Sequence, residues 1–568
     1  MYQHSSLPAS SLYWLSGFLW KDRTSVFAYT VAIVLAAIYV LQKYPLDFLL
    51  GSQGFLFLEQ GDPASQVAGW LFYMHDSWHL PLLHTYRLGH PEGVNIAFAD
   101  TIPLAALLFK LIRAWLPPQF HYIGIWHAVA FLTQALAATF LMRSLGQRHL
   151  FAIVVTVLLC LTWPALLWRT GHAALMTHAL ILCSLALYFS GRLNQIPTRN
   201  IAVAFITLNI IGLMIHPYYI AFCYPIFLAF LCDQALSGDG WKRQLPALTI
   251  SIAAIALVGM VFGYFGQNAQ AGGFTQFSMN LVAPFCGVDG QLISCFVDST
   301  GGQSEGYNYL GAGVLLLIPF AVVMAWPEVK ILHRRFPALL ITLALFTIYS
   351  ASSRVYFGSH EIFSYSLPTI LTATFRASGR FFWVVGYVIL FATLVVLFKK
   401  ASWRSAFLII IAFALQWTDL TSLRSHTTNI VSAPGKGDLV QWAPLMGKVD
   451  KIHVYPAFGC GALNLEVYWH YQRVASHFQK LLDTGYMARH SANCENNKRL
   501  FADGFESRHL YVMASELLKD FGEVPAGFKE ALQQDECVIW KENVLCSKGF
   551  NDTEWKATGL AVSSPYKK

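Results

Sequence analysis

The sequence predicts an α-helical polytopic membrane protein with about eleven transmembrane helices and a C-terminal extracytoplasmic α/β domain. Of its 568 residues, 55% are hydrophobic and only 12% are charged, whereas about a quarter of the residues of a soluble protein are charged. Apolar runs close to the ~20 residues that cross a bilayer as a helix recur from residue 25 to residue 420. After residue 425 the chain is polar. We therefore expect a transmembrane domain, 1–425, and a soluble C-terminal domain, 426–568.

The first apolar run, residues 26–41, follows a polar segment that ends in Lys21, Asp22 and Arg23. No small-residue cleavage site follows this run, so we interpret it as a retained span. Ten further runs are predicted to span: 123–142, 151–167, 173–189, 201–215, 218–231, 248–265, 309–326, 338–349, 381–397 and 406–417. Residues 103–116 are apolar but short and include Lys110 and Arg113, which predicts an amphipathic helix in the outer interface.

Basic residues cluster between spans, and such clusters favour the cytoplasmic side. The net charge of +8 belongs to the transmembrane domain, because the C-terminal domain carries as many basic as acidic residues. This pattern indicates membrane topology and not nucleic-acid binding. It predicts a multi-pass protein of the bacterial inner membrane with a cytoplasmic N-terminus and a periplasmic C-terminal domain. The long outer loops are then 43–120, 266–308 and 352–380.

The ten cysteines divide by position. Four lie within or at the ends of predicted spans and are interpreted as packing residues: Cys160, Cys183, Cys223 and Cys232. The other six lie in predicted outer segments, where an oxidising compartment favours disulfides. Cys286 and Cys295 are predicted to pair. The remaining four allow three pairings, of which Cys460–Cys494 with Cys537–Cys546 is the most local. None has the CxxC spacing of a zinc site.

The first outer loop holds the most informative acidic residue. Asp62 lies soon after the first span, in the sequence Gly61-Asp62-Pro63. A carboxylate at the membrane surface could act as a general base toward a sugar hydroxyl or position a metal. The alternative is structural, because Asp followed by Pro suits the cap and first residue of a helix. The same loop carries Glu92 and Asp100.

Two further segments carry charged residues at predicted outer turns. Arg169 and His172 precede a span, and Arg169 supports an anion site there. His172 and His178 are six residues apart and do not share a helix face, so they do not form a metal pair by themselves. Glu305 lies just before another span, in a glycine-rich stretch whose turn chemistry does not explain an acidic residue.

Arg376 and Arg380 lie at the outer end of a predicted span, against the usual charge bias. They are four residues apart and would share a face if the segment is helical. Two guanidiniums at the lipid boundary suit a phosphate or pyrophosphate, because arginine binds phosphate with two hydrogen bonds. The alternative is that both side chains reach out to lipid headgroups.

The sequence contains no P-loop, no Rossmann glycine fingerprint and no heptad repeat. An enzyme that works on the outer face without a nucleotide needs an activated donor that is already in the membrane. A sugar linked to a lipid phosphate meets that need.

In these features the chain resembles the GT-C superfamily of polytopic glycosyltransferases, and in particular a bacterial branch of it. The general likeness is a long first outer loop with an acidic residue soon after the first span, many spans and a C-terminal outer domain. The stretches that carry it are Gly61-Asp62-Pro63, Pro91-Glu92-Gly93-Val94-Asn95, Asp100-Thr101-Ile102-Pro103, residues 302–311, Phe375-Arg376-Ala377-Ser378-Gly379-Arg380-Phe381 and residues 484–489.

The resemblance implies transfer of a sugar from a polyprenyl-phosphate donor to a glycan or lipid acceptor of the cell envelope, or to a protein, on the periplasmic face. Asp62 matches the loop acid taken as catalytic base, and Arg376 or Arg380 would bind the donor phosphate. We expect Glu92, Asp100, His172 and Glu305 to line the sugar or acceptor pocket. Because Asp62 has no acidic neighbour, in contrast to the paired acids frequent in the superfamily, we expect no metal and no cofactor. The alternative functions are a flippase or transporter, or a polymerase, of lipid-linked glycans.

Overall fold

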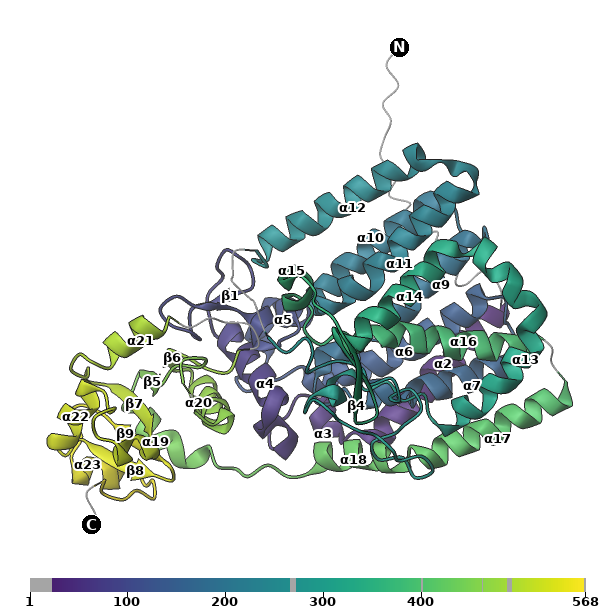
Figure 1. Cartoon of the computed structure of the whole chain (residues 1–568). Coiled ribbons are helices and arrows are strands. Elements are labelled where there is room, and N and C mark those ends of the chain that lie inside the picture. Colours follow the sequence, from purple (N-terminus) through teal and green to yellow (C-terminus); the bar gives the residue numbers. More distant parts are fainter. Residues whose placement is uncertain (1–22, 266–271, 400–401, 462, 488–492, 566–568) are drawn as a thin grey trace.

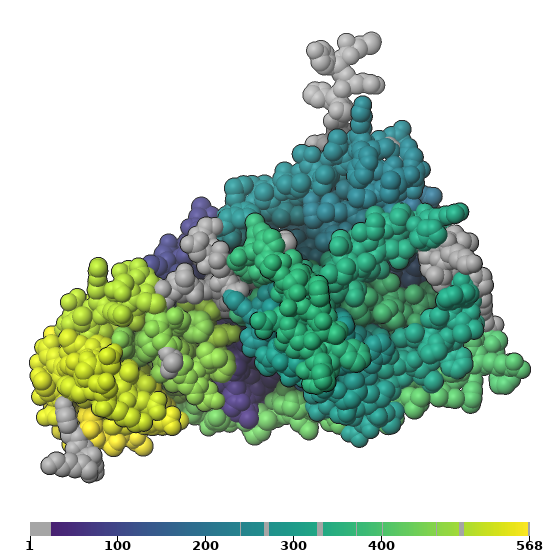
Figure 2. Space-filling model, in the orientation of Figure 1, coloured from purple at the N-terminus to yellow at the C-terminus, as the bar shows by residue number. Residues whose placement is uncertain are grey.

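The computed structural model describes residues 23–265, 272–399, 402–461, 463–487 and 493–565. A bundle of long helices carries, at one end, a C-terminal part with a five-stranded sheet (Figure 1). The space-filling view shows this C-terminal part, in yellow, lying against the end of the bundle (Figure 2). Residues 1–22, which bear on the predicted cytoplasmic N-terminus, and residues 266–271 of the second outer loop lie outside the described residues.

Within the described residues, eight helical segments are long and apolar enough to cross a membrane, or nine if one bent pair counts as a span. The eight contain α2 (Arg23–Lys43), α6 (Ile123–Ser144), α7 (Leu150–Leu161) with α8 (Pro164–Leu167), η4 (Ala173–Met176) with α9 (Ala179–Arg192), α10 (Thr198–Ile215), α11 (Tyr218–Gln234), α12 (Trp241–Val261), and η7 (Ser378–Phe381) with α16 (Phe382–Lys399). The bent pair is α17 (Trp403–Asp419) and α18 (Thr421–Ser432), which meet at 46°.

The predicted number of about eleven spans is not confirmed. Nine of the predicted segments overlap the eight long helical segments and the bent pair. The other two fall on shorter apolar helices, namely residues Ala312–Trp326 of α13 (Ala312–Arg335) and α14 (Pro337–Ala351). Both are shorter than the ~20 residues that span a bilayer without distortion. The prediction and the structure therefore differ in the length of these two apolar segments and agree in their positions.

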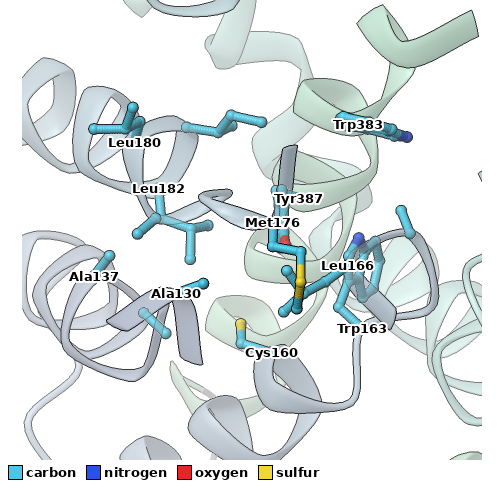
Figure 3. Packing of buried hydrophobic residues seen from close by; sticks show 14 of the residues in the cluster. Ala130, Ala137, Cys160, Trp163, Leu166, Met176, Leu180, Leu182, Trp383 and Tyr387 are labelled. Atoms are coloured by element: carbon cyan, nitrogen blue, oxygen red, sulfur yellow. The ribbon is translucent and has the colours of Figure 1, made fainter. Parts of the chain in front are cut away.

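The centre of the bundle is closely packed (Figure 3). Cys160, Trp163 and Met176 are each at most 2% exposed. The Trp163 ring stacks on Tyr387 of α16 with the ring centroids 5.1 Å apart, and Gln134 of α6 donates a hydrogen bond to the Tyr387 hydroxyl at 2.7 Å. Cys160 is thus a packing residue, as predicted.

The first outer loop is folded along its length and contains a buried helix. Its elements are α3 (Leu46–Leu49), η1 (Leu56–Glu59), α4 (Gly61–Met74), a hairpin of β1 (His84–Thr85) and β2 (Val94–Asn95), and η2 (Ile96–Ala99). All residues of α4 from Pro63 to Met74 are buried. The loop therefore fixes α4 rigidly against the rest of the protein.

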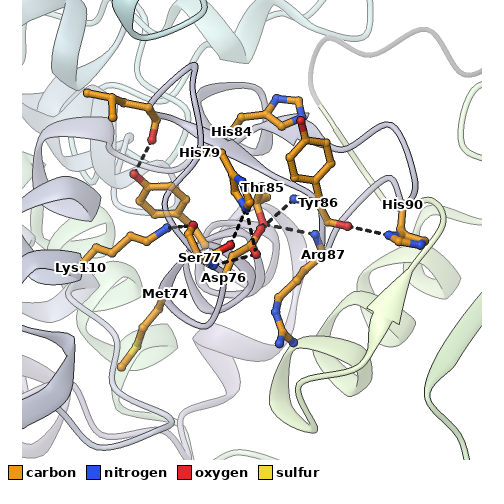
Figure 4. Close-up of polar contacts among 12 residues, drawn as sticks. Met74, Asp76, Ser77, His79, His84, Thr85, Tyr86, Arg87, His90 and Lys110 are labelled. Carbon is orange, nitrogen blue, oxygen red and sulfur yellow. Dashed lines mark hydrogen bonds and ion pairs between the residues drawn. The ribbon is translucent and has the colours of Figure 1, made fainter.

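Asp76 joins the end of α4 to the hairpin (Figure 4). Its carboxylate accepts hydrogen bonds from the Thr85 hydroxyl and from the backbone N–H groups of Tyr86 and Ser77, each at 2.8 Å. His79 Nε2 lies 3.2 Å from the same carboxylate. Burial alone would raise the pKa of Asp76, but these donors hold that pKa below its ordinary value. Asp76 is therefore a structural acid.

The predicted amphipathic helix is α5 (Pro103–Leu111), followed by η3 (Arg113–Trp115). Lys110 is 1% exposed and lies 3.6 Å from the centroid of the Tyr73 ring, so this charge points into the protein. Trp115 is 81% exposed. The outward side of the segment is thus apolar, which is the side that a membrane interface would contact. Its position in a membrane stays a prediction.

The second outer loop and the start of α13 are anchored at the end of α17. Cys286 and Cys295 form the predicted disulfide. The buried Asp419 carboxylate accepts hydrogen bonds from the Tyr309 hydroxyl at 2.6 Å and from the backbone N–H groups of Ala312 at 3.1 Å and Leu292 at 3.0 Å. The second and third outer loops form the elements η6 (Gln303–Gly306), β3 (Arg354–Phe357), β4 (His360–Ser364) and α15 (Thr369–Ala373).

The C-terminal part is a mixed sheet with helices, in the strand order β6-β5-β7-β9-β8. β5 is parallel to β6 and β7, and β9 is antiparallel to β7 and β8. The strands are β5 (Lys451–Tyr455), β6 (Leu481–Leu482), β7 (His509–Ala514), β8 (Cys537–Trp540) and β9 (Asn543–Cys546), and the helices of four or more residues are α19 (Ala443–Met446), α20 (Leu465–His477), α21 (Cys494–Leu500), η9 (Ser515–Lys519), α22 (Ala526–Gln533) and α23 (Asp552–Ala557).

Two disulfides close this part, Cys460–Cys494 and Cys537–Cys546, so the most local of the three pairings is confirmed. The bundle helix α18 runs on to Ser432, across the predicted domain boundary at residue 425. The sheet continues into the first outer loop, because the Leu482 N–H donates to the Arg87 carbonyl and the His90 N–H donates to the Leu482 carbonyl, both at 3.0 Å. The two parts are thereby joined through backbone hydrogen bonds.

Asp419→Ala should lower the thermal unfolding temperature of the purified protein. The substitution leaves a buried hydroxyl and buried N–H groups without an acceptor, and each such group costs about 1–3 kcal/mol. Asp503→Ala, at an exposed position, serves as the control. Equal unfolding temperatures for the two variants would contradict the anchoring role of Asp419.

Candidate active site

A cavity of about 250 Å³ lies where the outer loops, the helix ends and the C-terminal part meet. Six of the seven site residues predicted from the sequence line it: Asp62, Asp100, His172, Glu305, Arg376 and Arg380. They come from five separate segments of the chain. The structure thus brings these residues together, whereas their roles stay predictions.

Asp62 lies in the first turn of α4, after Gly61, whose φ of +57° suits a glycine. The carboxylate makes no hydrogen bond or ion pair with any other described residue, and the helix has no side-chain cap, so the structural alternative of helix capping is wrong. Burial raises the pKa of Asp62; nearby His172 opposes this effect, and the charges of Asp100 and Glu305 add to it. A carboxylate of this kind is a stronger proton acceptor than an ordinary aspartate.

Asp100, His172 and His216 form a second group in the cavity. His172 Nε2 lies 3.7 Å from Asp100 Oδ1, and the two imidazole rings are 5.5 Å apart. One ligand atom from each of the three residues lies within 4.8 Å of the other two. Two imidazoles and a carboxylate are a donor set that zinc accepts, so these residues could hold a divalent ion. The prediction that no metal takes part stays a prediction.

Glu305 lies in η6 between two arginines. Its carboxylate accepts a hydrogen bond from Arg169 Nη1 at 2.8 Å and a second, short one from Arg380 Nη2. Burial alone would raise the pKa of Glu305, but the two guanidiniums hold that pKa well below its ordinary value. Arg380 is therefore held in an ion-pair triad, and its predicted role in binding the donor phosphate stays a prediction.

Arg376 is different from Arg380. The segment is not one helix, because α15 ends at Ala373 and η7 begins only at Ser378, yet both arginines line the cavity. Arg376 has no acidic partner among the described residues, and its guanidinium lies 5.1 Å from the centroid of the Phe277 ring. This side chain is thus available for an anion.

Glu92 is not among the residues that line this cavity, and its predicted place in a sugar or acceptor pocket stays a prediction. Glu92 is exposed, and it follows the stretch of the first loop that pairs with β6. Its charge acts instead on Lys451 of β5, whose pKa is lowered by burial and partly restored by Asp483, Glu506 and Glu92. The position of Glu92 depends on contact with the C-terminal sheet, which the loop sequence does not reveal.

The lining residues that were not predicted as site residues include His216, Tyr218, Phe277 and Tyr486. The short turn that carries His216 and Tyr218 joins two predicted spans on the predicted outer side, and this position was the available signal. Tyr486 comes from the C-terminal part, in the stretch 484–489 that contributed to the resemblance. Its backbone is fixed by Gln472 of α20, with hydrogen bonds of 3.0 and 3.1 Å.

Family models match most of the chain. The model described as "Domain of unknown function (DUF6311)" matches residues 33–421, and the model described as "DUF6311 C-terminal domain" matches residues 441–538. The chain belongs to the DUF6311 family. A comparison with curated protein sequences finds no match.

Solved structures similar to this DUF6311 protein include oligosaccharyltransferases of Archaeoglobus fulgidus. The apo form is 10% identical over 88% of this chain and 70% of that chain, with a TM-score of 0.43. The complex with zinc and sulfate is 12% identical over 86% and 68%, with a TM-score of 0.43. The enzyme AglB in complex with an inhibitory peptide and a dolichol-phosphate is 11% identical over 91% and 73%, with a TM-score of 0.38.

By name, these neighbours are oligosaccharyltransferases. Membership of a bacterial branch of the GT-C superfamily stays a prediction. At such identities and TM-scores, the likeness does not assign an activity to the DUF6311 protein.

Proposed function

We propose that this DUF6311 protein is a membrane glycosyltransferase that moves a sugar from a polyprenyl-phosphate donor to a glycan or lipid acceptor of the cell envelope. The observation that supports it best is a single cavity with two unpaired charged groups. Among the described residues, the Asp62 carboxylate has no hydrogen-bond partner and the Arg376 guanidinium has no acidic partner. A proton acceptor and a phosphate-binding cation are the two groups that this reaction needs.

In the proposed reaction, Asp62 takes the proton of an acceptor hydroxyl as its oxygen forms a bond to the anomeric carbon of the donor. The bond between that carbon and the donor phosphate oxygen breaks, and the polyprenyl phosphate leaves with the bonding electrons. Arg376 stabilises the negative charge on the leaving phosphate. One displacement of this kind inverts the anomeric configuration. The raised pKa of Asp62 favours the proton transfer.

Arg380 has a supporting role in this proposal. Its guanidinium, with that of Arg169, neutralises Glu305 and leaves one net positive charge in the triad. That charge adds to the field that Arg376 presents to the phosphate. Asp100 and His172 would contact the donor sugar or the acceptor. A divalent ion held by Asp100, His172 and His216 would supply further positive charge near the phosphate.

The position of the cavity supports a donor that stays in the membrane. His172, His216 and Arg380 all lie at ends of long apolar helices, and Tyr486 of the C-terminal part covers the same cavity. The periplasmic face and the bacterial inner membrane are part of the proposal, through the distribution of basic residues between the spans.

Asp62→Asn should lower the rate of sugar transfer by about two to four orders of magnitude, because loss of a general base has effects of this size. The measurement is transfer by purified protein from a panel of polyprenyl-phosphate sugars to envelope glycans and lipids. Folding should be unchanged, because the carboxylate has no bonded partner to lose. Asp47→Asn, at an exposed position outside the cavity, is the matched control. Undiminished transfer by Asp62→Asn would show that Asp62 is not the base, and a wild type that transfers no sugar from any donor would favour a flippase or an assembly protein.

Arg376→Ala should raise the donor KM by about one to two orders of magnitude, since a hydrogen bond to a charged group contributes ~1.5–3 kcal/mol. Arg376→Lys should give a donor KM between those of the wild type and Arg376→Ala, because lysine keeps the charge but cannot make a bidentate hydrogen bond to the phosphate. Arg354→Ala, at an exposed position of β3, is the control. A rise in the acceptor KM, with the donor KM unchanged, would contradict the assignment of Arg376 to the donor phosphate.

Treatment with a chelator such as EDTA should leave transfer unchanged, because Asp62 and Arg376 meet the needs of the reaction without an ion. His216→Ala is assayed in the same way, because it removes one ligand from the group formed by Asp100, His172 and His216. Activity that chelation abolishes and Zn²⁺ or Mn²⁺ restores in the wild type, but not in His216→Ala, would assign a metal to this group and overturn the expectation.

A further inference from the structure

A second cavity, of about 470 Å³, is built from both parts of the chain. Its walls come from Glu59 and Gln60 ahead of α4, from the segment that connects α18 to the C-terminal part, from α20, and from the turn between β8 and β9. The volume lies within the roughly 300–1,000 Å³ of small-ligand sites. The mechanism proposed for Asp62 and Arg376 does not involve this cavity.

Two contacts place this cavity next to the candidate active site. Gln60 lines the second cavity, and Asp62, two residues further along the chain, lines the first. Trp469 of α20 lines the second cavity, and its ring centroid is 5.6 Å from that of Tyr486, which lines the first. The linings of the two cavities are thus in contact, and the two cavities lie side by side.

The charges of the second cavity nearly balance. Four carboxylates and three cationic side chains line it. Arg473 Nη2 lies between two of the carboxylates, 3.3 Å from Glu59 and 3.2 Å from Asp438. A strongly anionic ligand would meet an excess of carboxylates. An acyl chain would find only one aliphatic side chain, Val467, in the lining.

Four buried polar atoms of the lining have no hydrogen-bond partner among the described residues: Trp469 Nε1, His470 Nε2, the Tyr471 hydroxyl and Asn543 Oδ1. Tyr471 is 0% exposed and Asn543 is 7% exposed. Buried polar groups without partners are costly, so a ligand that completes their bonding is favoured. The four include donors and an acceptor, and sugar hydroxyls can serve both.

We propose that the second cavity binds the non-reacting sugar units of a hydroxyl-rich glycan acceptor, whose reacting hydroxyl extends to Asp62. This inference rests on the proposed function and names its acceptor class, an oligosaccharide and not a simple lipid. Polar side chains of α20 and β9 hold the sugar units, and the Trp469 indole contributes a flat apolar surface beside its N–H donor. The C-terminal part thus selects the acceptor.

Tyr471→Phe tests the inference because it removes only a hydroxyl that bonds to no described residue, and Trp469→Phe removes an unbonded N–H together with part of the indole ring. Neither substitution should harm folding. Transfer by the full-length protein is measured with one donor and two acceptors, one with a single sugar and one with four. Each variant should raise the KM of the four-sugar acceptor about fivefold, as expected for one lost hydrogen bond, with kcat and the donor KM unchanged. Trp115→Phe, at a position 81% exposed, is the matched control.

An unchanged KM for the four-sugar acceptor in both variants would overturn the inference and leave the proposed function intact. If the wild type transfers no sugar from any donor, the proposed function fails instead. Binding to an immobilised set of bacterial envelope oligosaccharides then decides the inference alone. Binding by the wild type and by Asp62→Asn, with loss in Trp469→Phe and Tyr471→Phe, supports it. Equal binding by all four proteins overturns it.

Discussion

The candidate site depends on one half-buried carboxylate held by two buried guanidiniums. Glu305 of η6 binds Arg169, in the turn before η4, and Arg380 of η7. Removing three charges from water is costly, and only their mutual attraction offsets that cost. The triad therefore forms only when the helix ends and the loop are correctly placed. Once formed, it fixes the wall from which Arg376 projects.

The opposite wall depends on contact between the two parts of the chain. α20 packs along α4, and Gln472 of α20 holds the backbone of Tyr486 over the cavity. Backbone hydrogen bonds between Leu482 and the first outer loop add a second link. Neither part forms the cavity by itself. The C-terminal sheet thus has a direct place in the architecture of the site and is not an appended domain.

The sequence predicted the features that depend on local pattern. Apolar runs located every long helix, and short cysteine spacings identified the disulfides, because neighbouring cysteines meet wherever the chain turns between them. Features that depend on contacts between distant segments were missed. The pairing of Arg380 with Glu305, the approach of His216 to His172 and the position of Glu92 beside the C-terminal sheet each join residues far apart in the chain. The spans predicted at α13 and α14 are not confirmed, because the apolar stretches there are shorter than those of the eight long helical segments.

Asp62, which is half-buried, differs from three other acids that lie wholly or partly inside the protein. Asp76 accepts at least three hydrogen bonds, Asp419 is surrounded by donors, and Glu305 binds two arginines. Each of these acids has a structural reason for its burial. Asp62 is near the site centre with no bonded partner, so its charge destabilises the fold without any compensating contact. A side chain retained at such a cost is explained by a proton or a ligand that it receives, and the open cavity in front of it provides the room for one.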